Sequence, residues 1–545
     1  MDFNFDKSGF AYIWKIAAVT ALVIFSAQFA ASELGAMAFV QESGTFGSLP
    51  AVGASGNKPR EPVYQKLTGT EAILANGEGV LAKKNELLAE GRDFVFADLG
   101  EMRITVYRGA SPSHGFGPLR HSSSEASEAS TTTFDILSKG RDGSFFETPS
   151  GIYTIGYKEK NHFSSIGKVW MPWSMYIFGN YFIHGWPYYP NGRPVEASFS
   201  GGCIRLSVAD AGKLFALVKE GMPVLIYAAG APLPAGSEGA SKLTEAYFKK
   251  VDPAKTAKTP KLSASAYLAA DFETGQVLLA KNADSVYSIA SVTKLMTALV
   301  AAESFQARSL KINKTELATY GSSGGFVVGE IFSSDKLLYP MLLASSNDAA
   351  SVFENEGWRF IDMMNQKAKA IGMELTHYKD ASGLAQENVS TANNLFTLLK
   401  YIYSNKKPIF DILALPKYTA SSDNQKKQHT WINMNWPAAD DRLISGKSGY
   451  TDEARETFAG VFKVKMSEDG GRKIAIIVLH SEAREGDINA IIRHLEDTIV
   501  YGNVLVENGA KTVPKVYFNE ANVFEALGRS PSVVDLRARP YVKIK

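Results

Sequence analysis

The chain has 545 residues, of which 45% are hydrophobic and 21% charged, and its formal net charge at pH 7 is +2. This length exceeds what one hydrophobic core supports, so we expect two or three domains of ordinary globular composition. The near-neutral charge and the lack of Lys/Arg runs give no argument for nucleic-acid binding, and we predict none. A single cysteine excludes an intrachain disulfide framework.

The amino terminus carries a signal for export. Residues 16–32 contain no charged side chain and are mostly Ala, Val, Leu, Ile and Phe. Such a stretch suits the apolar core of a signal peptide or a short membrane span. Ala36-Met37-Ala38 offers a cleavage site, whereas Glu33 and the weakly charged start leave an uncleaved anchor open. We therefore predict a signal peptide or membrane anchor over 1–38. The rest would be exported to the periplasm or cell envelope, held at the inner membrane if the segment is not cleaved.

The next segment, 39–91, combines a tether rich in Gly, Ser and Pro with a partly helical stretch. From 92 to 228 the alternation of apolar residues predicts a mostly β domain. Its expected elements, in chain order, are a hairpin at 93–107 with its turn at Gly100, a flexible loop at 109–133, a strand at 152–155, a strand at 175–183 that ends beside His184, a helix at 209–217 and a closing strand at 224–227.

The only cysteine of the chain lies in Ser198-Phe199-Ser200-Gly201-Gly202-Cys203-Ile204-Arg205-Leu206. The two glycines let backbone amides approach a bound carbonyl closely, where they can stabilise an oxyanion. His184 lies upstream, and a Cys and a His from separate elements are the minimum for thiol acyl transfer. A buried structural cysteine is the alternative.

This region resembles the catalytic domain of the L,D-transpeptidases, which join the stem peptides of bacterial peptidoglycan. The resemblance rests on His184-Gly185, on Ser200-Gly201-Gly202-Cys203-Ile204-Arg205 and on Thr148-Pro149-Ser150-Gly151. It implies a Cys203 nucleophile, held as a thiolate by His184, whose other ring nitrogen would meet a backbone carbonyl such as that of Gly185.

The same resemblance implies that amides near Gly202 and Cys203 hold the oxyanion. Arg205 would orient this loop or meet a substrate carboxylate, and an ion pair within the domain is its alternative role. The sequence departs from the family at Gly201, where a second histidine is usual.

A second chemistry follows a predicted linker over 229–262. After two expected strands, at 267–272 and 276–280, Ser291-Val292-Thr293-Lys294 begins a helical pattern. Three residues span one helical turn, so the hydroxyl and the amine share a face. Ser-x-x-Lys also occurs elsewhere in the chain, and we assign the copies at Ser165–Lys168, Ser333–Lys336 and Ser404–Lys407 to ordinary surface.

The Ser291 copy is distinguished by two later motifs. Ser345-Ser346-Asn347 follows an expected helix at 337–343, and Lys447-Ser448-Gly449 precedes an alternating strand. Their order agrees with the penicillin-binding signature. Together with Asp380-Ala381-Ser382-Gly383-Leu384 and Tyr450-Thr451-Asp452-Glu453-Ala454, they make residues 263–515 similar to the low-molecular-mass D-alanyl-D-alanine carboxypeptidases.

That resemblance implies a role for each motif residue. Ser291 would be the nucleophile, with Lys294 as its base once burial and the cation of Lys447 lower its pKa. Ser345 would relay the proton to the leaving D-alanine. The remaining residues would bind substrate: Asn347 the stem amide, and Lys447 and Ser448 the terminal carboxylate. Gly449 and Tyr450 complete the predicted substrate-binding set, with amides of Ser291 and Tyr450 as the oxyanion hole.

Other chemistries find less support. A β-lactamase of the Glu-x-x-x-Asn type would need that motif between Asn347 and Lys447, and the sequence lacks it. Acylation by penicillin is therefore the expectation. Histidines fall into no ligand spacing, so we predict neither a metal site nor a cofactor. The C-terminal tail, 516–545, has a basic end that could pack on the second domain or touch the cell-wall polymer.

We therefore expect a multidomain α+β protein, with a mostly-β L,D-transpeptidase sandwich followed by a penicillin-binding/β-lactamase-like domain of helices and an antiparallel sheet. Its predicted function is bifunctional peptidoglycan remodelling: a serine D,D-carboxypeptidase trims pentapeptide stems, and a cysteine L,D-transpeptidase cross-links the resulting tetrapeptides. The alternatives are hydrolysis only (D,D-endopeptidase and L,D-carboxypeptidase) or a wall-binding protein with one inactive domain. Expected partners are peptidoglycan stem peptides, β-lactams as covalent inhibitors, and the membrane if the amino-terminal segment is uncleaved.

Overall fold

The computed structural model describes residues 63–66, 76–109, 130–228, 246–251, 259–306, 308–321, 323–356, 359–437, 440–467, 470–504 and 516–517. The predicted signal or anchor segment, 1–38, and nearly all of the tail lie outside these ranges. Among the helices that are described, none is long and apolar enough to cross a membrane.

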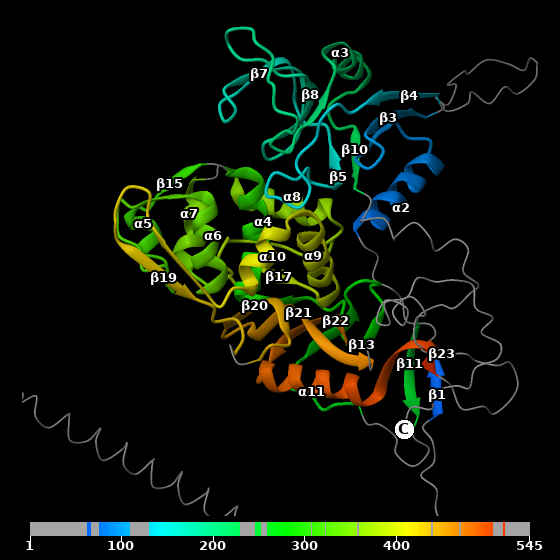
Figure 1. Ribbon diagram of the computed structural model, residues 1–545, viewed down its shortest axis with the longest axis vertical. Helices are drawn as coiled ribbons and strands as arrows, with labels where there is room; N and C mark the ends of the chain where they lie inside the picture. Colours follow the sequence, from blue (N-terminus) through cyan, green and yellow to red (C-terminus); the bar gives the residue numbers. More distant parts are fainter. Residues whose placement is uncertain are drawn as a thin grey trace, which may run out of the picture. The chain divides into compact units, whose positions relative to one another are not determined.

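The first region, up to residue 228, contains two sheets (Figure 1). A five-stranded sheet has the order β4-β3-β2-β10-β5, and a four-stranded sheet has the order β6-β7-β8-β9. The strands are β2 (Phe94–Asp98), β3 (Arg103–Arg108), β4 (Ser130–Asp135), β5 (Gly151–Thr154), β6 (Lys158–Ser164), β7 (Val169–Phe178), β8 (Tyr181–Gly185), β9 (Ile204–Leu206) and β10 (Pro223–Tyr227). Two helices accompany them, α2 (Asn76–Ala89) and α3 (Val208–Leu217).

Strand β2 is buried on both faces, because successive side chains of a strand point to opposite sides. Phe94 and Phe96 pack with residues of α2, which covers one face of the sheet. Val95 and Ala97 join the core that β2 shares with β7, β8 and β9. The continuous apolar run Phe-Val-Phe-Ala therefore reflects a central strand rather than an edge.

Two expectations for this region are corrected. The apolar run 175–183 is not one strand: β7 ends at Phe178 and β8 begins at Tyr181, with Gly179 (φ 55°) at the turn between them. Glycine adopts this left-handed conformation without strain, so the two residues Gly179 and Asn180 reverse the chain between two apolar strands. Similarly, Ser130–Thr133, predicted as loop, opens strand β4, where pairing with β3 outweighs the polar composition.

The second region is a sheet of order β13-β12-β22-β21-β20 with helices around it (Figure 1). Its strands are β12 (Ala266–Asp271), β13 (Val277–Lys281), β20 (Leu443–Thr451), β21 (Arg455–Ser467) and β22 (Gly470–Ser481). Its main helices are α4 (Lys294–Ser304), α6 (Ser334–Leu343), α7 (Asn347–Glu356), α8 (Phe360–Ala370), α9 (Ala392–Asn405), α10 (Lys407–Ala414) and α11 (Arg484–Thr498). Shorter elements are η1 (Ala290–Thr293), α5 (Lys314–Leu317), β14 (Tyr287–Ser288), β15 (Ser309–Lys311), β16 (Ile331–Ser333), β17 (Val389–Ser390), β18 (Lys417–Ser421) and β19 (Gln428–Ile432).

The alternation of β22 explains how both faces of this sheet are covered. Ala475 and Ile477 belong to the large core that includes α4, α6, α9 and α10. Ile474 and Ile476 belong to a second core with Ile488 and its neighbours on α11. Helices thus cover both faces, in agreement with the expected helical cluster plus antiparallel sheet.

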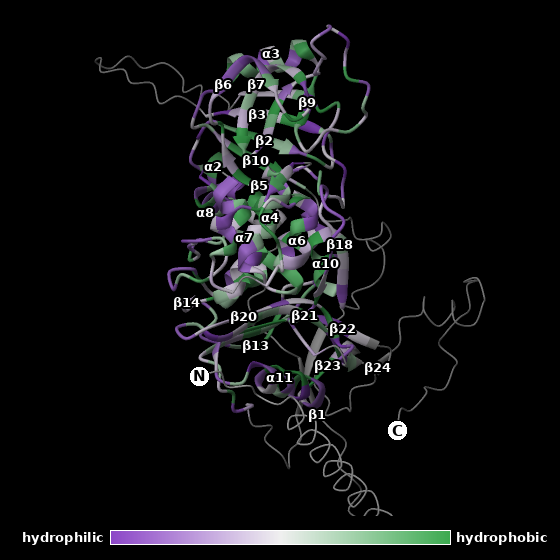
Figure 2. Ribbon diagram, turned by 90° about the vertical axis from the view of Figure 1, so that its left-hand side faces the viewer, coloured by the Kyte–Doolittle hydropathy of each residue, from purple (hydrophilic) through white to green (hydrophobic). Residues whose placement is uncertain are grey.

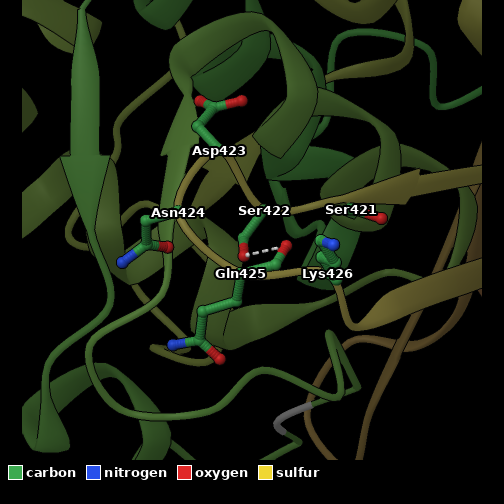
Figure 3. Close-up of a pocket in the computed structure, with 6 residues that line it drawn as sticks. All are labelled: Ser421, Ser422, Asp423, Asn424, Gln425 and Lys426. Carbon is green, nitrogen blue, oxygen red and sulfur yellow. Dashed lines mark hydrogen bonds between the residues drawn. The ribbon is translucent and has the colours of Figure 1, made fainter.

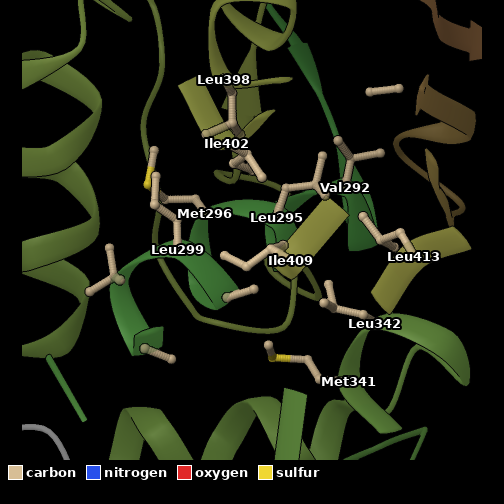
Figure 4. Close-up of a cluster of buried hydrophobic side chains, with 14 of the residues drawn as sticks. Val292, Leu295, Met296, Leu299, Met341, Leu342, Leu398, Ile402, Ile409 and Leu413 are labelled. Atoms are coloured by element: carbon tan, nitrogen blue, oxygen red, sulfur yellow. The ribbon is translucent and has the colours of Figure 1, made fainter. Parts of the chain in front are cut away.

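Helix α4 lies at the centre of the helical cluster, and every one of its residues is buried. Leu295, Met296 and Leu299 contact side chains from α6, α9 and α10 (Figure 4). By contrast, α7 and α8 carry hydrophilic stretches (Figure 2), as expected of helices with one exposed face. A helix buried all round keeps its first residue, Lys294, away from water.

Residues predicted as linker or tail contribute strands to a further sheet. Its order is β1-β11-β23-β24, formed by β1 (Val63–Lys66), β11 (Ala246–Val251), β23 (Ile499–Val504) and β24 (Val516–Tyr517). The predicted linker over 229–262 is therefore partly regular structure. Its strand β11 pairs with β1 and β23, which are distant in sequence, and local composition gives no signal for such pairing.

The two regions share a buried polar interface. The ammonium of Lys367 on α8 lies 2.9 Å from the carboxylate of Glu303 on α4, and both side chains are fully buried. Lys367 also donates hydrogen bonds of 2.8 Å to the hydroxyls of Tyr153 on β5 and Tyr401 on α9. The first region thus supplies one of the three groups that surround this ammonium.

Two candidate acylation sites

The serine site begins where a 3₁₀ turn passes into α4. Ser291 lies in η1 and Lys294 is the first residue of α4, so the two side chains are one turn apart. The Lys294 ammonium donates a hydrogen bond of 2.8 Å to Ser291 Oγ. The predicted nucleophile and its predicted base are therefore in contact.

Lys294 is held in a polar cage inside an apolar core. Its ammonium also donates to Asn347 Oδ1 and to the carbonyl of Ser382, both at 2.6 Å. Burial lowers the pKa of Lys294 to about 7, although the carboxylates of Asp380 and Asp348 act in the opposite direction. Near neutral pH a large fraction of this lysine is uncharged and can take the proton of Ser291.

The second motif sits at the junction of α6 and α7. Asn347 begins α7, and its Nδ2 donates to the carbonyl of Tyr320 at 2.7 Å. Ser345 adopts a left-handed conformation with φ 56°. In the described ranges its hydroxyl makes no hydrogen bond, so it is available to a ligand. The structure thus brings Asn347 of the second motif into contact with Lys294 of the first.

The third motif lies inside strand β20 rather than before a strand. The Lys447 ammonium donates to Asn435 Oδ1 at 2.6 Å and to the Ser448 carbonyl at 2.8 Å. Ser448 Oγ donates to the same Asn435 oxygen at 3.2 Å. Burial, together with the charges of Lys294 and Arg484, holds the pKa of Lys447 well below its usual range.

Gly449 lets this strand pass beside the nucleophile. A Cβ at this position would lie 2.8 Å from the backbone nitrogen of Ser291 and 2.9 Å from the carbonyl of Ile289. Thr457, on the neighbouring strand, donates to the same Ile289 carbonyl at 3.0 Å. Glycine is therefore needed for the close approach. Tyr450, one residue on, has an exposed side chain that donates to Asp452.

Sequence reasoning missed residues that support the serine site. Asn435 binds both Lys447 and Ser448, and Arg484 donates to the Gly449 carbonyl at 3.2 Å. Neither lies in a motif with a recognisable spacing. Asp380 accepts hydrogen bonds from the backbone amides around Ser382 and so shapes the loop that holds Lys294. The sequence identifies this segment by its resemblance to the family, but it gives no role for Asp380.

The thiol site is built on two parallel strands. The register of β8 and β9 pairs Ile183 with Ile204 and His184 with Arg205. Ile183 and Ile204 point into the core, so alternation places His184 and Arg205 on the opposite face, together with Cys203. The structure thus puts the predicted nucleophile and base on one face of one sheet.

The pKa shifts of these two groups bear on the expected thiolate. Burial raises the pKa of the Cys203 thiol, which donates to the carbonyl of Asn180 over 3.6 Å. Burial also lowers the pKa of His184 to about 4. Both shifts favour a neutral thiol and a neutral imidazole over the expected thiolate in the resting protein, and the thiolate itself stays a prediction. Among the described contacts, none is a hydrogen bond between the sulfur and the imidazole.

The orientation of His184 agrees with the prediction. Its Nδ1 lies 2.6 Å from the carbonyl oxygen of Gly185. A carbonyl can only accept, so Nδ1 carries the hydrogen and Nε2 keeps its lone pair. The imidazole is therefore held in the tautomer that can act as a base.

Gly202 and Arg205 shape the loop around the cysteine. Gly202 has φ 114°, and a Cβ there would lie 2.0 Å from the ring of Tyr181. Its amide donates to Ser200 Oγ at 3.0 Å, so binding an oxyanion requires this bond to open. Arg205 donates to the carbonyls of Ala197 and Phe199, the loop-orienting role. No ion pair of Arg205 occurs within the parts of the chain that are described.

Other features of the structure lie apart from these sites. A pocket at the turn between β18 and β19 is lined by residues 421–426, none of which belongs to either predicted site (Figure 3). Within the described ranges, no group of three His, Cys, Asp or Glu side chains could hold a metal ion.

The geometry of the serine site, with nucleophile and base in hydrogen-bond contact, is typical of enzymes that form an acyl intermediate on a serine. Residues 253–482 match the family described as D-alanyl-D-alanine carboxypeptidase, and residues 93–226 match the L,D-transpeptidase catalytic domain. A D-alanyl-D-alanine carboxypeptidase of Mycobacterium tuberculosis is 30% identical over 252 residues, which cover 43% of this chain and 81% of that protein. The chain therefore belongs to the D-alanyl-D-alanine carboxypeptidase family and carries an L,D-transpeptidase catalytic domain in the same polypeptide.

Two further similarities concern the carboxypeptidase region. A D-alanyl-D-alanine endopeptidase of Escherichia coli is 30% identical over 247 residues, covering 42% of this chain and 75% of that protein. The solved D-alanyl-D-alanine carboxypeptidase from Mycobacterium tuberculosis H37Rv is 26% identical, covers 45% of this chain and 95% of that chain, and has a TM-score of 0.40.

Proposed function

We propose that this protein is a bifunctional peptidoglycan-remodelling enzyme. Its serine site would trim pentapeptide stems to tetrapeptides, and its cysteine site would cross-link those tetrapeptides. The observation that carries the proposal is the contact between Lys294 and Ser291, with a lysine pKa of about 7, in a chain that also holds an L,D-transpeptidase domain. The product of the first reaction is the acyl donor of the second.

In the serine half, neutral Lys294 takes the proton of Ser291 as Oγ attacks the carbonyl of the penultimate D-alanine. The C–N bond then breaks, and the departing D-alanine amine receives a proton through Ser345. Water hydrolyses the ester and regenerates the serine. The amides of Ser291 and Tyr450 would hold the oxyanion, and Gly449 makes room for the strand that carries the second of them.

Substrate binding in this half would follow the charges of the site. The terminal carboxylate of the stem would meet Lys447, Ser448 and the neighbouring Arg484, whose positive charge already acts on Lys447. A bound carboxylate would offset the burial of the Lys447 ammonium. Asn347 would hydrogen-bond the stem amide from the opposite side.

In the cysteine half, the pKa values favour general-base catalysis over a preformed thiolate. His184 Nε2 would take the thiol proton as Cys203 attacks the carbonyl of the third stem residue. D-Alanine leaves with that proton, and an amine of a neighbouring stem then attacks the thioester. The new amide bond releases Cys203 as a thiol.

Several finer predictions remain part of this proposal. They are the domain bounds of 92–228 and 263–515, the sandwich arrangement of the first domain, acylation of Ser291 by β-lactams, and an exported, cell-envelope location. The shared core of β2 with β7, β8 and β9 supports the sandwich. The names of the relatives support peptidoglycan stems as substrates.

The experiment separates the two nucleophiles. Pentapeptide muropeptides should be trimmed by the wild type and by Cys203→Ala, but not by Ser291→Ala. Cross-linking of tetrapeptides should be lost in Cys203→Ala and kept in Ser291→Ala. Ser404→Ala is a matched control, because Ser404 begins another Ser-x-x-Lys sequence but is exposed. Loss of trimming in the Ser404 variant, or trimming by Ser291→Ala, would refute the assignment.

A hydrolytic function is the second candidate, and the similarity to an endopeptidase favours it. In that case water rather than an amine resolves the acyl-enzymes, and the serine site cleaves D,D-cross-links. Product masses distinguish cross-linking from hydrolysis. Cross-linking joins two stems into a dimer, whereas hydrolysis yields monomers only. A wall-binding protein with one inactive domain would fail to form a covalent adduct at one nucleophile, with a penicillin at Ser291 or a carbapenem at Cys203.

A further inference from the structure

The carboxy-terminal end of α4 reaches the thiol site. Ser304 is the last residue of α4, and its carbonyl is one of those that a helix leaves without an intrahelical partner. Asn180 Nδ2 donates to this carbonyl at 2.5 Å. The backbone carbonyl of the same Asn180 accepts the thiol of Cys203. The residue that contacts the nucleophile is thus tied to the peptidase region.

Gln306, two residues further on, makes a second connection. Its Nε2 donates to the Phe145 carbonyl at 2.9 Å and to the Tyr181 hydroxyl at 3.0 Å. The ring of Tyr181 packs directly on Gly202, the residue before the cysteine. Gln306 therefore holds a side chain that forms one wall of the cysteine loop.

Gln306 also faces the position at which the sequence departs from its family. A Cβ at Gly201 would find one neighbouring heavy atom within 4 Å, the Oε1 of Gln306 at 3.6 Å. The space beside Gly201 is thus bordered by a polar group of the other region. A side chain at this position would therefore lie beside the Gln306 amide.

We infer that Gln306 is a positioning residue of the thiol site, supplied by the peptidase region to the Gly201-Gly202-Cys203 loop. It fixes Tyr181 against the loop, while the end of α4 fixes Asn180. The chemistry that it serves is the cysteine half of the proposed function, on which this inference rests. The thiol site of the L,D-transpeptidase region is then complete only when that region is joined to the peptidase region.

The interface makes such positioning rigid. Lys406 donates to the Glu147 carbonyl at 2.5 Å, and Ser150 Oγ donates to Asn405 Oδ1 at 2.8 Å. These bonds join the same two regions on the side of the Lys367 ammonium. Both hydrogen bonds are buried. The position of Gln306 relative to the loop is therefore fixed by these bonds as well as by its own two.

The test measures Cys203 directly in the full-length protein. It is the only cysteine of the chain, so the rate of alkylation by iodoacetamide reports on this thiol alone, through its thiolate fraction and its accessibility. Gln306→Glu places a carboxylate at the loop, which disfavours the thiolate. We expect the alkylation rate at pH 8.5 to fall by about three- to tenfold, the change produced by a pKa rise of about 0.5 to 1.

In Gln306→Ala we expect kcat for tetrapeptide cross-linking to fall about tenfold with little change in KM, because the loop is less ordered but the substrate contacts remain.

Asn405→Ala is the matched control, because it removes a hydrogen bond between the regions that does not involve the cysteine loop. It should leave the alkylation rate unchanged, and penicillin acylation of Ser291 should be unchanged in all three variants. The inference is overturned if Gln306→Glu alkylates at the wild-type rate, or if Asn405→Ala slows alkylation equally, which would make docking alone the cause. If the wild type forms no cross-links, the proposed function fails, whereas the alkylation ratio still decides the role of Gln306.

Discussion

The ammonium of Lys294 lies 2.8 Å from Ser291 Oγ at a site where burial lowers the lysine pKa to about 7. One helical turn brings the two side chains together, and the surrounding core of α4 removes the lysine from water. The three-residue spacing places the two side chains in contact, and burial by the fold lowers the lysine pKa so that it can act as a base. Both are needed, because a lysine with an ordinary pKa would be protonated at neutral pH and could not accept a proton.

This relationship predicts how the serine reaction depends on pH. The active form of Lys294 is the uncharged one, so acylation of Ser291 by a penicillin should increase about tenfold per pH unit below pH 7 and level off above it. The measurement is the second-order acylation rate between pH 5.5 and 9, followed by mass spectrometry of the intact protein. A rate that is flat across pH 6 to 8 would contradict a lysine base. Lys294→Met should lower the plateau by about 10²- to 10⁴-fold, the usual contribution of a positioned base.

In the absence of substrate the thiol should reach its full reactivity only at a higher pH than the serine. Burial raises the pKa of Cys203 and lowers that of His184 to about 4. Alkylation of the free enzyme should therefore be slow at pH 6 to 8, and its rate should continue to increase with pH beyond the ordinary thiol range. A plateau that is already reached near pH 6 would indicate a thiolate–imidazolium pair and contradict the neutral resting state. Ser291→Ala is the control, because it should not alter this profile.

The sequence predicted those parts of the sites that are local. Ser291 and Lys294 are one turn apart on a helix, and His184 and Cys203 lie at the ends of two strands, so spacing and alternation place them. The partners that tune them come from distant segments: Asn435 reaches Lys447, and Gln306 reaches the cysteine loop. No periodicity relates these positions, so the sequence gives no signal for them.

Burial explains what local sequence leaves open at the thiol site and in the strands. Whether a thiol is ionised depends on how much water reaches it, and a motif does not show that. By its apolar content the run 175–183 reads as one strand, because both β7 and β8 are buried. The pair Gly179-Asn180 is the two-residue hairpin signal that marks the turn in the sequence.

The buried pair of Lys367 and Glu303 leads to a prediction about stability. Lys367→Met removes the only ammonium within ion-pairing distance of Glu303 among the described residues. A buried carboxylate left without its partner typically costs about 3–5 kcal/mol of unfolding free energy. Lys406 also acts on this carboxylate, so we expect the lower end of that range. Denaturant unfolding of the full chain measures it.

The double variant Lys367→Met/Glu303→Gln is the informative control for that pair. Removing both charges should recover much of the stability, since no unpaired charge remains buried. If the double variant is as unstable as the sum of the two single variants, the pair is not coupled and the prediction is wrong. Penicillin acylation of Ser291 serves as the measure that the peptidase region is still folded.

Two adjacent glycines give the sharpest comparison at the thiol site. Gly202 has φ 114°, and a Cβ there would lie 2.0 Å from the Tyr181 ring, whereas a Cβ at Gly201 would make an ordinary contact of 3.6 Å. Gly202→Ala should therefore displace Tyr181 or the loop and lower carbapenem acylation of Cys203 by about tenfold or more. Gly201→Ala should leave it within about twofold, because ordinary van der Waals contact requires no displacement. In both variants penicillin should acylate Ser291 at the wild-type rate. Equal effects of the two substitutions would show that the loop is not held against Tyr181, and the account of the thiol site would then have to be abandoned.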